Sequence, residues 1–317
     1  MNRAFDTGAA QGAAANAKPD AGRNAALVRL AAASSVAVAG VLILTKFAAW
    51  LATDSVGLLS TLIDSLLDVA ASLLNYLAVR QALTPADREH RFGHGKAEPL
   101  AGLGQAAFIC GSALFLVIQA GERLYHPRPI VNPEVGYVVL VASMILTIGL
   151  VGFQTYVVRR TGSVAIGADS LHYKSDVLVN GSVIGSVFLA SEFGWMAVDP
   201  IVAIGIAAYI VWGAWRIGAA SLNILMDHEL PQSEREKIRT IVKAHPEVRG
   251  LHDLRTRSSG QQIFIQLHLE LDGEMKLKDV HEISEAVMAE LEAAFPAAEV
   301  IVHEDPEGAM EPRKVFT

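Results

Sequence analysis

The sequence predicts a multi-pass α-helical membrane protein, with six transmembrane helices followed by a C-terminal α+β domain. Hydrophobic residues make up 52% of the 317 residues and charged residues only 19%, whereas soluble domains carry about 25% charged residues. The hydrophobic excess is concentrated between about residues 26 and 222. We therefore expect a disordered tail over residues 1–25, a membrane domain over 26–222 and an extramembrane domain over 223–317.

Six segments are long and apolar enough to cross a bilayer, which takes roughly 20 mostly apolar residues. The expected spans are residues 27–52, 56–83, 99–121, 134–158, 164–190 and 198–221. An even number of spans places both ends of the chain on the same side of the membrane. Lysine and arginine gather before the first span, around the loop between spans two and three, and at Arg159 and Arg160. This bias predicts that both termini are cytoplasmic.

After the last span the pattern becomes that of a small α+β domain. Pro231 precedes a helix with acidic residues in its first turn, which suits the helix dipole. The order αββαβ describes an open-faced sandwich, with helices on one side of a sheet. The remaining expected elements are strands over Gly250–Arg257 and Gln262–Leu271, a helix over Leu277–Phe295 and a strand over Glu299–His303.

Composition also excludes several kinds of site and partner. The chain has one cysteine, Cys110, so neither a disulfide framework nor a thiolate metal site is expected. A net charge of −7 without a basic stripe argues against nucleic acid as a partner.

Ionisable residues inside apolar spans are costly and mark functional pathways by default. The second span carries Asp64 and Asp68, and the fifth carries His172 and Asp176. Each pair is four residues apart, so its members share one face of a helix. Hydrogen bonds within the bundle could satisfy a single such pair, but two pairs in separate spans favour a bound metal ion. The four side chains would form a cage of one nitrogen and three oxygen ligands.

Such a cage favours Zn²⁺, which binds His and Asp in tetrahedral sites, over Mg²⁺ and Ca²⁺, which prefer oxygen alone. Cadmium and ferrous iron remain alternatives. A membrane metalloprotease would need a general base beside a metal-bound water, typically within His-Glu-x-x-His, and this motif is absent from the sequence. A channel would line its pore with rings of charge or carbonyls rather than a closed cage. We therefore expect a transporter and no enzyme.

These residues resemble the cation diffusion facilitators, in particular the bacterial YiiP-type zinc exporters. The resemblance also rests on Phe92-Gly-His-Gly-Lys-Ala-Glu98 and on His-Asp-Leu-Arg-Thr-Arg at 252–257. It implies a six-helix membrane domain with a cytoplasmic, metallochaperone-like domain, working as a homodimer in the bacterial inner membrane and exchanging Zn²⁺ for protons. The four cage residues match the family's transport-site positions. Manganese-selective relatives carry Asp where this chain has His172, so the resemblance favours zinc, with cadmium as a second substrate.

The resemblance implies two further metal sites. Asp87, His90 and His94 lie in the loop between spans two and three, and the two histidines would share a face if the loop continued as a helix. Without the resemblance, a solvated polar loop would be the ordinary interpretation. The C-terminal domain is dense in ligand types, and the resemblance implies a dinuclear zinc site at the dimer interface. Its expected ligands are His252, His268, His281, His303 and Asp305.

The last implied feature is a charge interlock between subunits, formed by Lys96 before the third span and Asp227 after the sixth. A lone surface ion pair contributes only about 0–1 kcal/mol, so this role comes from the resemblance alone.

Because the cage ligands must lose protons to bind metal, proton–metal exchange follows from competition for the same atoms. Rocking of helices around a fixed site would alternate access.

Overall fold

The computed structural model describes residues 7–53, 56–125, 134–193 and 198–308, with the side chains at several helix ends left out of the description. The chain divides into two compact units. The helical unit covers Asn24–Leu225, and the C-terminal unit begins at Met226. Each unit is described by itself.

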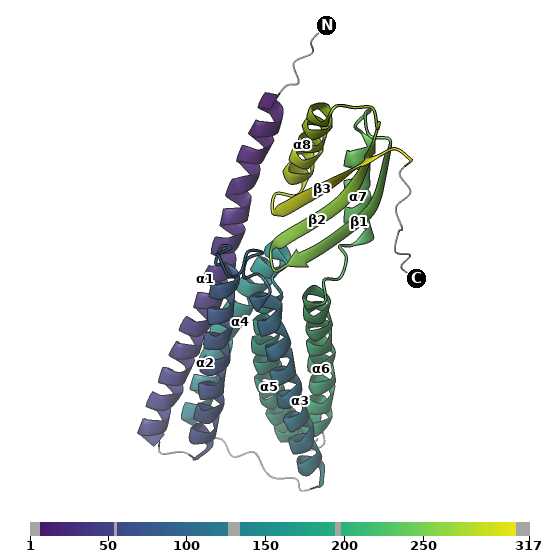
Figure 1. Cartoon of the computed structure of the whole chain (residues 1–317). Coiled ribbons are helices and arrows are strands. Elements are labelled where there is room, and N and C mark those ends of the chain that lie inside the picture. Colours follow the sequence, from purple (N-terminus) through teal and green to yellow (C-terminus); the bar gives the residue numbers. More distant parts are fainter. Residues whose placement is uncertain (1–6, 54–55, 126–133, 194–197, 309–317) are drawn as a thin grey trace. The chain divides into compact units, whose positions relative to one another are not determined.

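Six long helices make up the helical unit, and they match the six expected spans in number and order (Figure 1). Four segments among the described residues are long and apolar enough to cross a membrane: Gly22–Leu51, Ala97–Glu122, Val141–Thr161 and Ile201–Leu225. These lie in the first, third, fourth and sixth helices; the second and fifth carry the ionisable pairs. The helices are α1 (Thr7–Thr53), α2 (Val56–Ala82), α3 (Ala97–Tyr125), α4 (Glu134–Thr161), α5 (Val164–Phe193) and α6 (Val198–Leu225).

The start of α1 differs from the sequence-based expectation. Residues 1–25 were expected to be a disordered tail, but α1 begins at Thr7 and continues without a break to Thr53. The segment from residue 9 to residue 17 is rich in alanine, which has the highest helix propensity of all residues. This segment is not apolar enough to stand out by hydropathy, but its alanine content favours a helix.

Helix α5 is held between two apolar clusters of the helical unit. Ala165 and Ile166 pack with residues of α1, α2 and α4, whereas Leu171 packs with residues of α3 and α6. Gly213 of α6 allows a close approach, because a Cβ atom there would stand 2.9 Å from Leu171 Cδ2. The segment that carries His172 is therefore surrounded by the other helices of its unit.

The C-terminal unit has the expected αββαβ order, with bounds close to those predicted. The antiparallel pair β1–β2 meets at Gly260, whose φ of +60° suits the expected turn. Strands β2 and β3 are parallel and joined through α8, giving the sheet order β1-β2-β3. The elements are α7 (Gln232–Lys243), β1 (Gly250–Ser259), β2 (Gln262–Leu271), α8 (Leu277–Ala294) and β3 (Ala298–Pro306).

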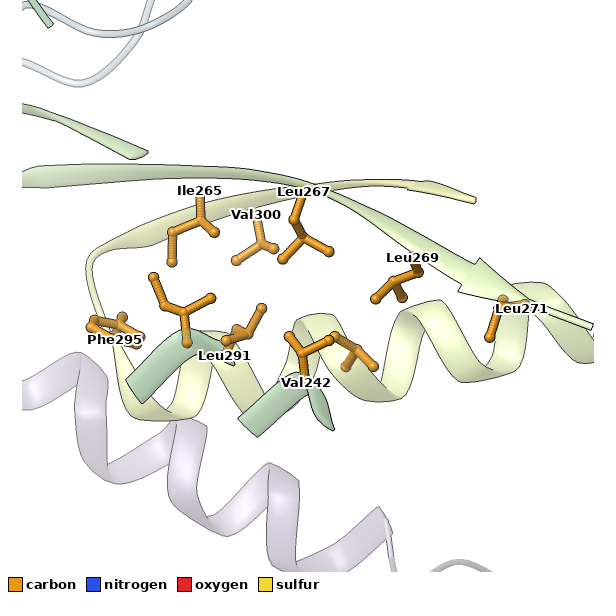
Figure 2. Packing of buried hydrophobic residues seen from close by; sticks show 10 residues of the cluster. Val242, Ile265, Leu267, Leu269, Leu271, Leu291, Phe295 and Val300 are labelled. Carbon is orange, nitrogen blue, oxygen red and sulfur yellow. The ribbon is translucent and has the colours of Figure 1, made fainter. Parts of the chain in front are cut away.

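The core of the C-terminal unit lies between one face of the sheet and helices α7 and α8 (Figure 2). Leu267, Leu269 and Leu271 alternate along β2 and point to this face, as the two-residue period of a strand requires. Leu291 of α8 and Val242 of α7 meet them from the helical layer. The intervening residues of β2, including His268 and Glu270, therefore belong to the opposite face of the sheet.

Candidate metal centres

The first candidate centre lies between α2 and α5. His172 Nε2 stands 3.0 Å from Asp68 Oδ1 across the two helices and 3.9 Å from Asp176 Oδ2 one turn further along α5. One potential ligand atom from each residue lies within 4.8 Å of the others. The side chain of Asp64, the fourth expected ligand, lies outside the described part of the structure. The other three lie together, with Asp176 one turn after His172 on α5 and Asp68 facing His172 from α2.

These distances suit a tetrahedral ion. Ligands about 2.1 Å from Zn²⁺ stand about 3.4 Å from one another in a tetrahedral site, and the two distances from His172 Nε2, 3.0 and 3.9 Å, lie on either side of this value. His172 is only 5% exposed, and the ring of Phe108 packs against it edge-on with centroids 5.8 Å apart. The imidazole is therefore held in place by its neighbours.

The second candidate centre is in the loop between α2 and α3. Asp87 Oδ1 lies 3.5 Å from His90 Nδ1, and Asp87 Oδ2 lies 3.4 Å from His94 Nε2. The rings of His90 and His94 have centroids 4.5 Å apart. The three residues expected to form the loop site thus converge, with ligand spacings that also suit Zn²⁺.

The loop does not continue as a helix, which was the condition for His90 and His94 to share a face. Helix α2 ends at Ala82 and α3 begins at Ala97. Turns bring the ligands together instead: the backbone N–H groups of His90 and Glu89 donate to Asp87 Oδ1 over 2.6 and 2.9 Å. The hydrogen bond from the His90 N–H, helped by that from Glu89, holds the pKa of Asp87 below its ordinary value of 3.8. This carboxyl is therefore ionised at any physiological pH.

The third candidate centre lies on the face of the C-terminal sheet opposite the core. His252, His268 and His303 are neighbours in register across the three strands. Asp305 stands in the next row, where it is paired with Glu270. This register explains why residues far apart in the sequence come together on one face.

Asp305 offers its two oxygens to different histidines. Oδ2 lies 3.1 Å from His252 Nε2 and 2.8 Å from His268 Nδ1, whereas Oδ1 lies 3.3 Å from His303 Nε2. A carboxylate placed in this way is suited to bridging two ions. Among the described residues, His281 does not join this group: it is exposed on α8, which covers the other face of the sheet.

Two carboxylates beside this centre were missed in the sequence. Glu270 Oε1 lies 2.8 Å from His252 Nδ1, the ring nitrogen that faces away from Asp305. Asp253 Oδ2 lies 3.8 Å from His268 Nε2, and its pair with Arg255 holds the pKa of Asp253 below the ordinary value. Glu270 follows His268 by two residues on a strand, a spacing that could have revealed it.

Lys96 and Asp227, expected to form an interlock between subunits, have contacts within their own units. Lys96 Nζ donates to the carbonyl of Leu225 over 3.4 Å. Asp227 Oδ2 lies 3.4 Å from Arg257 Nη1. Neither contact tests the predicted interlock of Lys96 and Asp227 between subunits, which stays a prediction.

Comparison with known protein families shows which family the chain belongs to. A family model described as the cation efflux transmembrane domain matches residues 32–226, which is more than half of the chain. The chain belongs to the cation efflux family. A second family model, described as the cytoplasmic domain of cation efflux proteins, matches residues 230–307. The predicted cation diffusion facilitator resemblance and the predicted fold class are confirmed.

Two members of the cation efflux family are similar to this chain over most of their length. The chain is 47% identical over 279 residues to the cation-efflux pump FieF of Shewanella oneidensis, covering 88% of this chain and 94% of the relative. It is 48% identical over 280 residues to the FieF pump of Klebsiella pneumoniae, covering 88% and 93%. A solved structure, the metal-bound C-terminal domain of the CzcD transporter from Thermotoga maritima, is 29% identical and covers 26% of this chain and 100% of its own, with a TM-score of 0.25.

Membership of the cation efflux family makes this chain a membrane transporter of cations, with a cytoplasmic domain after its transmembrane domain. The three candidate metal centres rest on the geometry of this chain's own residues.

Proposed function

We propose that this protein exports a divalent metal ion, Zn²⁺, from the cytoplasm in exchange for protons, and that Asp64, Asp68, His172 and Asp176 carry the ion. The observation that supports this most is the convergence of ligand atoms from α2 and α5 within 4.8 Å inside apolar helices. Unpaired carboxylates at the bilayer centre are costly, about 2.5–3.5 kcal/mol each on insertion scales. A bound dication offsets this cost.

The donor set supports zinc as the substrate. One imidazole with carboxylates is a Zn²⁺ set, and the imidazole moves preference away from Mg²⁺ and Ca²⁺. Cadmium and ferrous iron could occupy the same cage and are the alternatives that a metal panel must compare.

Proton exchange follows from the same ligands. Each must be deprotonated on the binding atom to hold a metal ion, so protons and Zn²⁺ compete for His172 Nε2 and the carboxylates. Protons from the more acidic outer side would displace the ion outward, and rebinding of metal from the cytoplasm would release the protons inward. The short distance between His172 Nε2 and Asp68 Oδ1, 3.0 Å, allows these two atoms to share one proton when no metal is present.

The remaining assignments complete the proposal. Residues 26–222 form the transport domain in the bacterial inner membrane, and residues 223–317 form a cytoplasmic domain that binds metal and pairs two subunits; both termini are cytoplasmic. The loop set (Asp87, His90 and His94) and the C-terminal set bind cytoplasmic Zn²⁺. In the C-terminal set, Asp305 bridges two ions. Lys96 and Asp227 link the subunits near the membrane surface.

The proposal is tested by reconstituting the full-length chain in vesicles with an acidic interior. We expect saturable Zn²⁺ uptake that rises with the pH gradient and is matched by proton movement in the opposite direction. Zn²⁺ uptake that is independent of the pH gradient would contradict antiport, and uptake that does not saturate would indicate a channel.

A further inference from the structure

A fully buried carboxyl of the helical unit takes no part in the proposed cage. Asp169 lies on α5, three residues before His172, and is 0% exposed. The two residues are therefore neighbours along one face of the helix. Buried ionisable groups in membrane helices mark function by default, so this carboxyl calls for an explanation beyond packing.

Three neutral donors from three other helices surround this carboxyl. Gln105 Nε2 of α3 donates to Asp169 Oδ1 over 3.2 Å, and Gln154 Nε2 of α4 donates to Oδ2 over 2.7 Å. The hydroxyl of Ser35 on α1 also donates to Oδ2. All four side chains expose 7% or less of their surface. Asp169 thus fixes α5 to α1, α3 and α4 at one point.

Ser35 extends this network to the other ligand-bearing helix. The hydroxyl of Tyr173 donates to the Ser35 carbonyl over 3.3 Å and also lies 2.8 Å from Ser72 Oγ of α2. Ser72 is four residues after Asp68, one turn along the same face of α2. Gln154 Nε2 also donates to Ser35 Oγ over 2.8 Å. Ser35 therefore contacts two residues of α5, Asp169 and Tyr173, and Tyr173 in turn contacts Ser72 of α2.

We propose that Asp169 is a positioning residue for the transport cage: with Ser35 and Tyr173 it sets the distance between Asp68 on α2 and His172 on α5, and so the choice of metal. This inference rests on the proposed function of the cage. The residues of the network flank both ligands in sequence, at Asp169 and Tyr173 around His172 and at Ser72 after Asp68. A change of a few tenths of an ångström between α2 and α5 would alter the cage, because tetrahedral Zn²⁺ fixes the spacing of its ligands.

A network that served only to hold the bundle together would predict a different outcome. Its loss would lower the thermal stability and the amount of active protein, leaving the Michaelis constant for zinc and the preference between metals unchanged. A positioning network changes those two quantities. Outer partners of metal ligands typically change metal affinity by about 10–100-fold when mutated.

The test compares Asp169→Asn, Ser35→Ala and Tyr173→Phe by Zn²⁺, Cd²⁺ and Mn²⁺ uptake into vesicles. We expect each to raise the Michaelis constant for Zn²⁺ by about tenfold or more and to reduce the preference for Zn²⁺ over Mn²⁺, in addition to any fall in melting temperature from the lost buried hydrogen bond. Ser34→Ala is the matched control, because the hydroxyl of the half-buried Ser34 donates to Leu30 of its own helix over 2.8 Å and not, among the described residues, to the Asp169 network; its Michaelis constant should stay within about twofold of the wild type. Tyr173→Phe deletes one hydroxyl and decides the test if Asp169→Asn does not fold.

The double variant Asp169→Asn with Tyr173→Phe adds an internal check. Both act through Ser35, so their effects on the Michaelis constant should be less than additive, as expected for residues that share a partner. Additive effects on the Michaelis constant would contradict the role of Ser35 as the shared partner of Asp169 and Tyr173.

Asp68→Ala separates this inference from the proposed function. If Asp68→Ala abolishes uptake while the three network variants keep the wild-type Michaelis constant and metal preference, the cage stands and the positioning role is wrong. If Asp68→Ala transports normally, the proposed cage itself is wrong and the positioning role falls with it.

Discussion

His172 Nε2 lies 3.0 Å from Asp68 Oδ1, which joins the two helices that carry the proposed transport ligands. The imidazole is nearly buried, and Asp176 Oδ2 approaches the same nitrogen to 3.9 Å. Two carboxylates from different helices thus face one ring nitrogen in an apolar bundle. A cation at their centre would satisfy all three groups.

Replacing Asp68 with asparagine should abolish metal transport while leaving the fold intact. The carboxamide keeps the shape and can still contact His172, but it is a weak zinc ligand and has no charge to offset that of the ion. We expect Zn²⁺ uptake to fall by about 100-fold or more, the upper range found even for outer-shell losses. Uptake into vesicles and melting temperature should be measured together, and transport at the wild-type rate would remove Asp68 from the cage.

The loop centre should show a particular pH dependence. The His90 N–H and the Glu89 N–H hold the pKa of Asp87 below 3.8. A carboxyl whose pKa is lowered in the folded loop stays ionised at and above its ordinary value, and is neutralised only as the pH falls through the lowered value. Release of Zn²⁺ from the loop between about pH 7 and pH 5 must therefore come from protonation of other ligands.

Asp87→Asn consequently should weaken Zn²⁺ binding at every pH in this range, because the Asp87 carboxylate is ionised throughout it. We expect about a tenfold or greater loss of affinity at each pH. The measurement is calorimetric titration with Zn²⁺ at several pH values, in an Asp68→Ala background that disables the transport cage. Wild-type affinity at every pH in Asp87→Asn would remove Asp87 from the loop centre.

Gly250 should be required by the C-terminal centre. A Cβ atom at this position would stand 2.8 Å from Cδ of Glu270, whose carboxylate lies 2.8 Å from His252 Nδ1. In Gly250→Ala the flexible Glu270 side chain would move away at small cost in stability, leaving the His252 ring less well oriented. Losing such an outer partner typically costs about 10–100-fold in metal affinity.

Zn²⁺ titration of full-length Gly250→Ala and Glu270→Gln checks this expectation, with Glu299→Gln as the control. Glu299 is an exposed carboxylate on β3, in register with Phe264 and away from the histidine row. We expect both test variants to weaken the same class of sites and the control to match the wild type. Equal affinity in all four proteins would leave Glu270 without a role at the centre.

The sequence predicted the features that depend on local periodicity. The four-residue spacings from Asp64 to Asp68 and from His172 to Asp176 are properties of single helices. The six helices and the αββαβ order follow from hydropathy and turn residues. The proposed cage, which joins the ligand pairs of the second and fifth spans, could therefore be predicted from the spans before the family resemblance was used.

Features that depend on strand register or on distant helices were not predicted. Asp253 approaches His268 because β1 has an extra residue between His252 and Arg255, and Asp253 adopts a φ of +46° there. Asp169 meets Ser35, which is 134 residues away in the chain. Such contacts arise from tertiary packing, which hydropathy and spacing do not encode. The extension of α1 to Thr7 was missed because hydropathy does not report the helix propensity of alanine.

The central claim is that His172 and its carboxylate partners select and carry the ion, and uptake competition on wild type and His172→Asp tests it most directly. Vesicles would be given Zn²⁺ with increasing Mn²⁺ or Cd²⁺, and the uptake of each metal measured. The cage predicts that the wild type prefers Zn²⁺, and that His172→Asp, now with oxygen ligands only, loses this discrimination while still transporting metal. An unchanged preference for Zn²⁺ in His172→Asp would contradict the account.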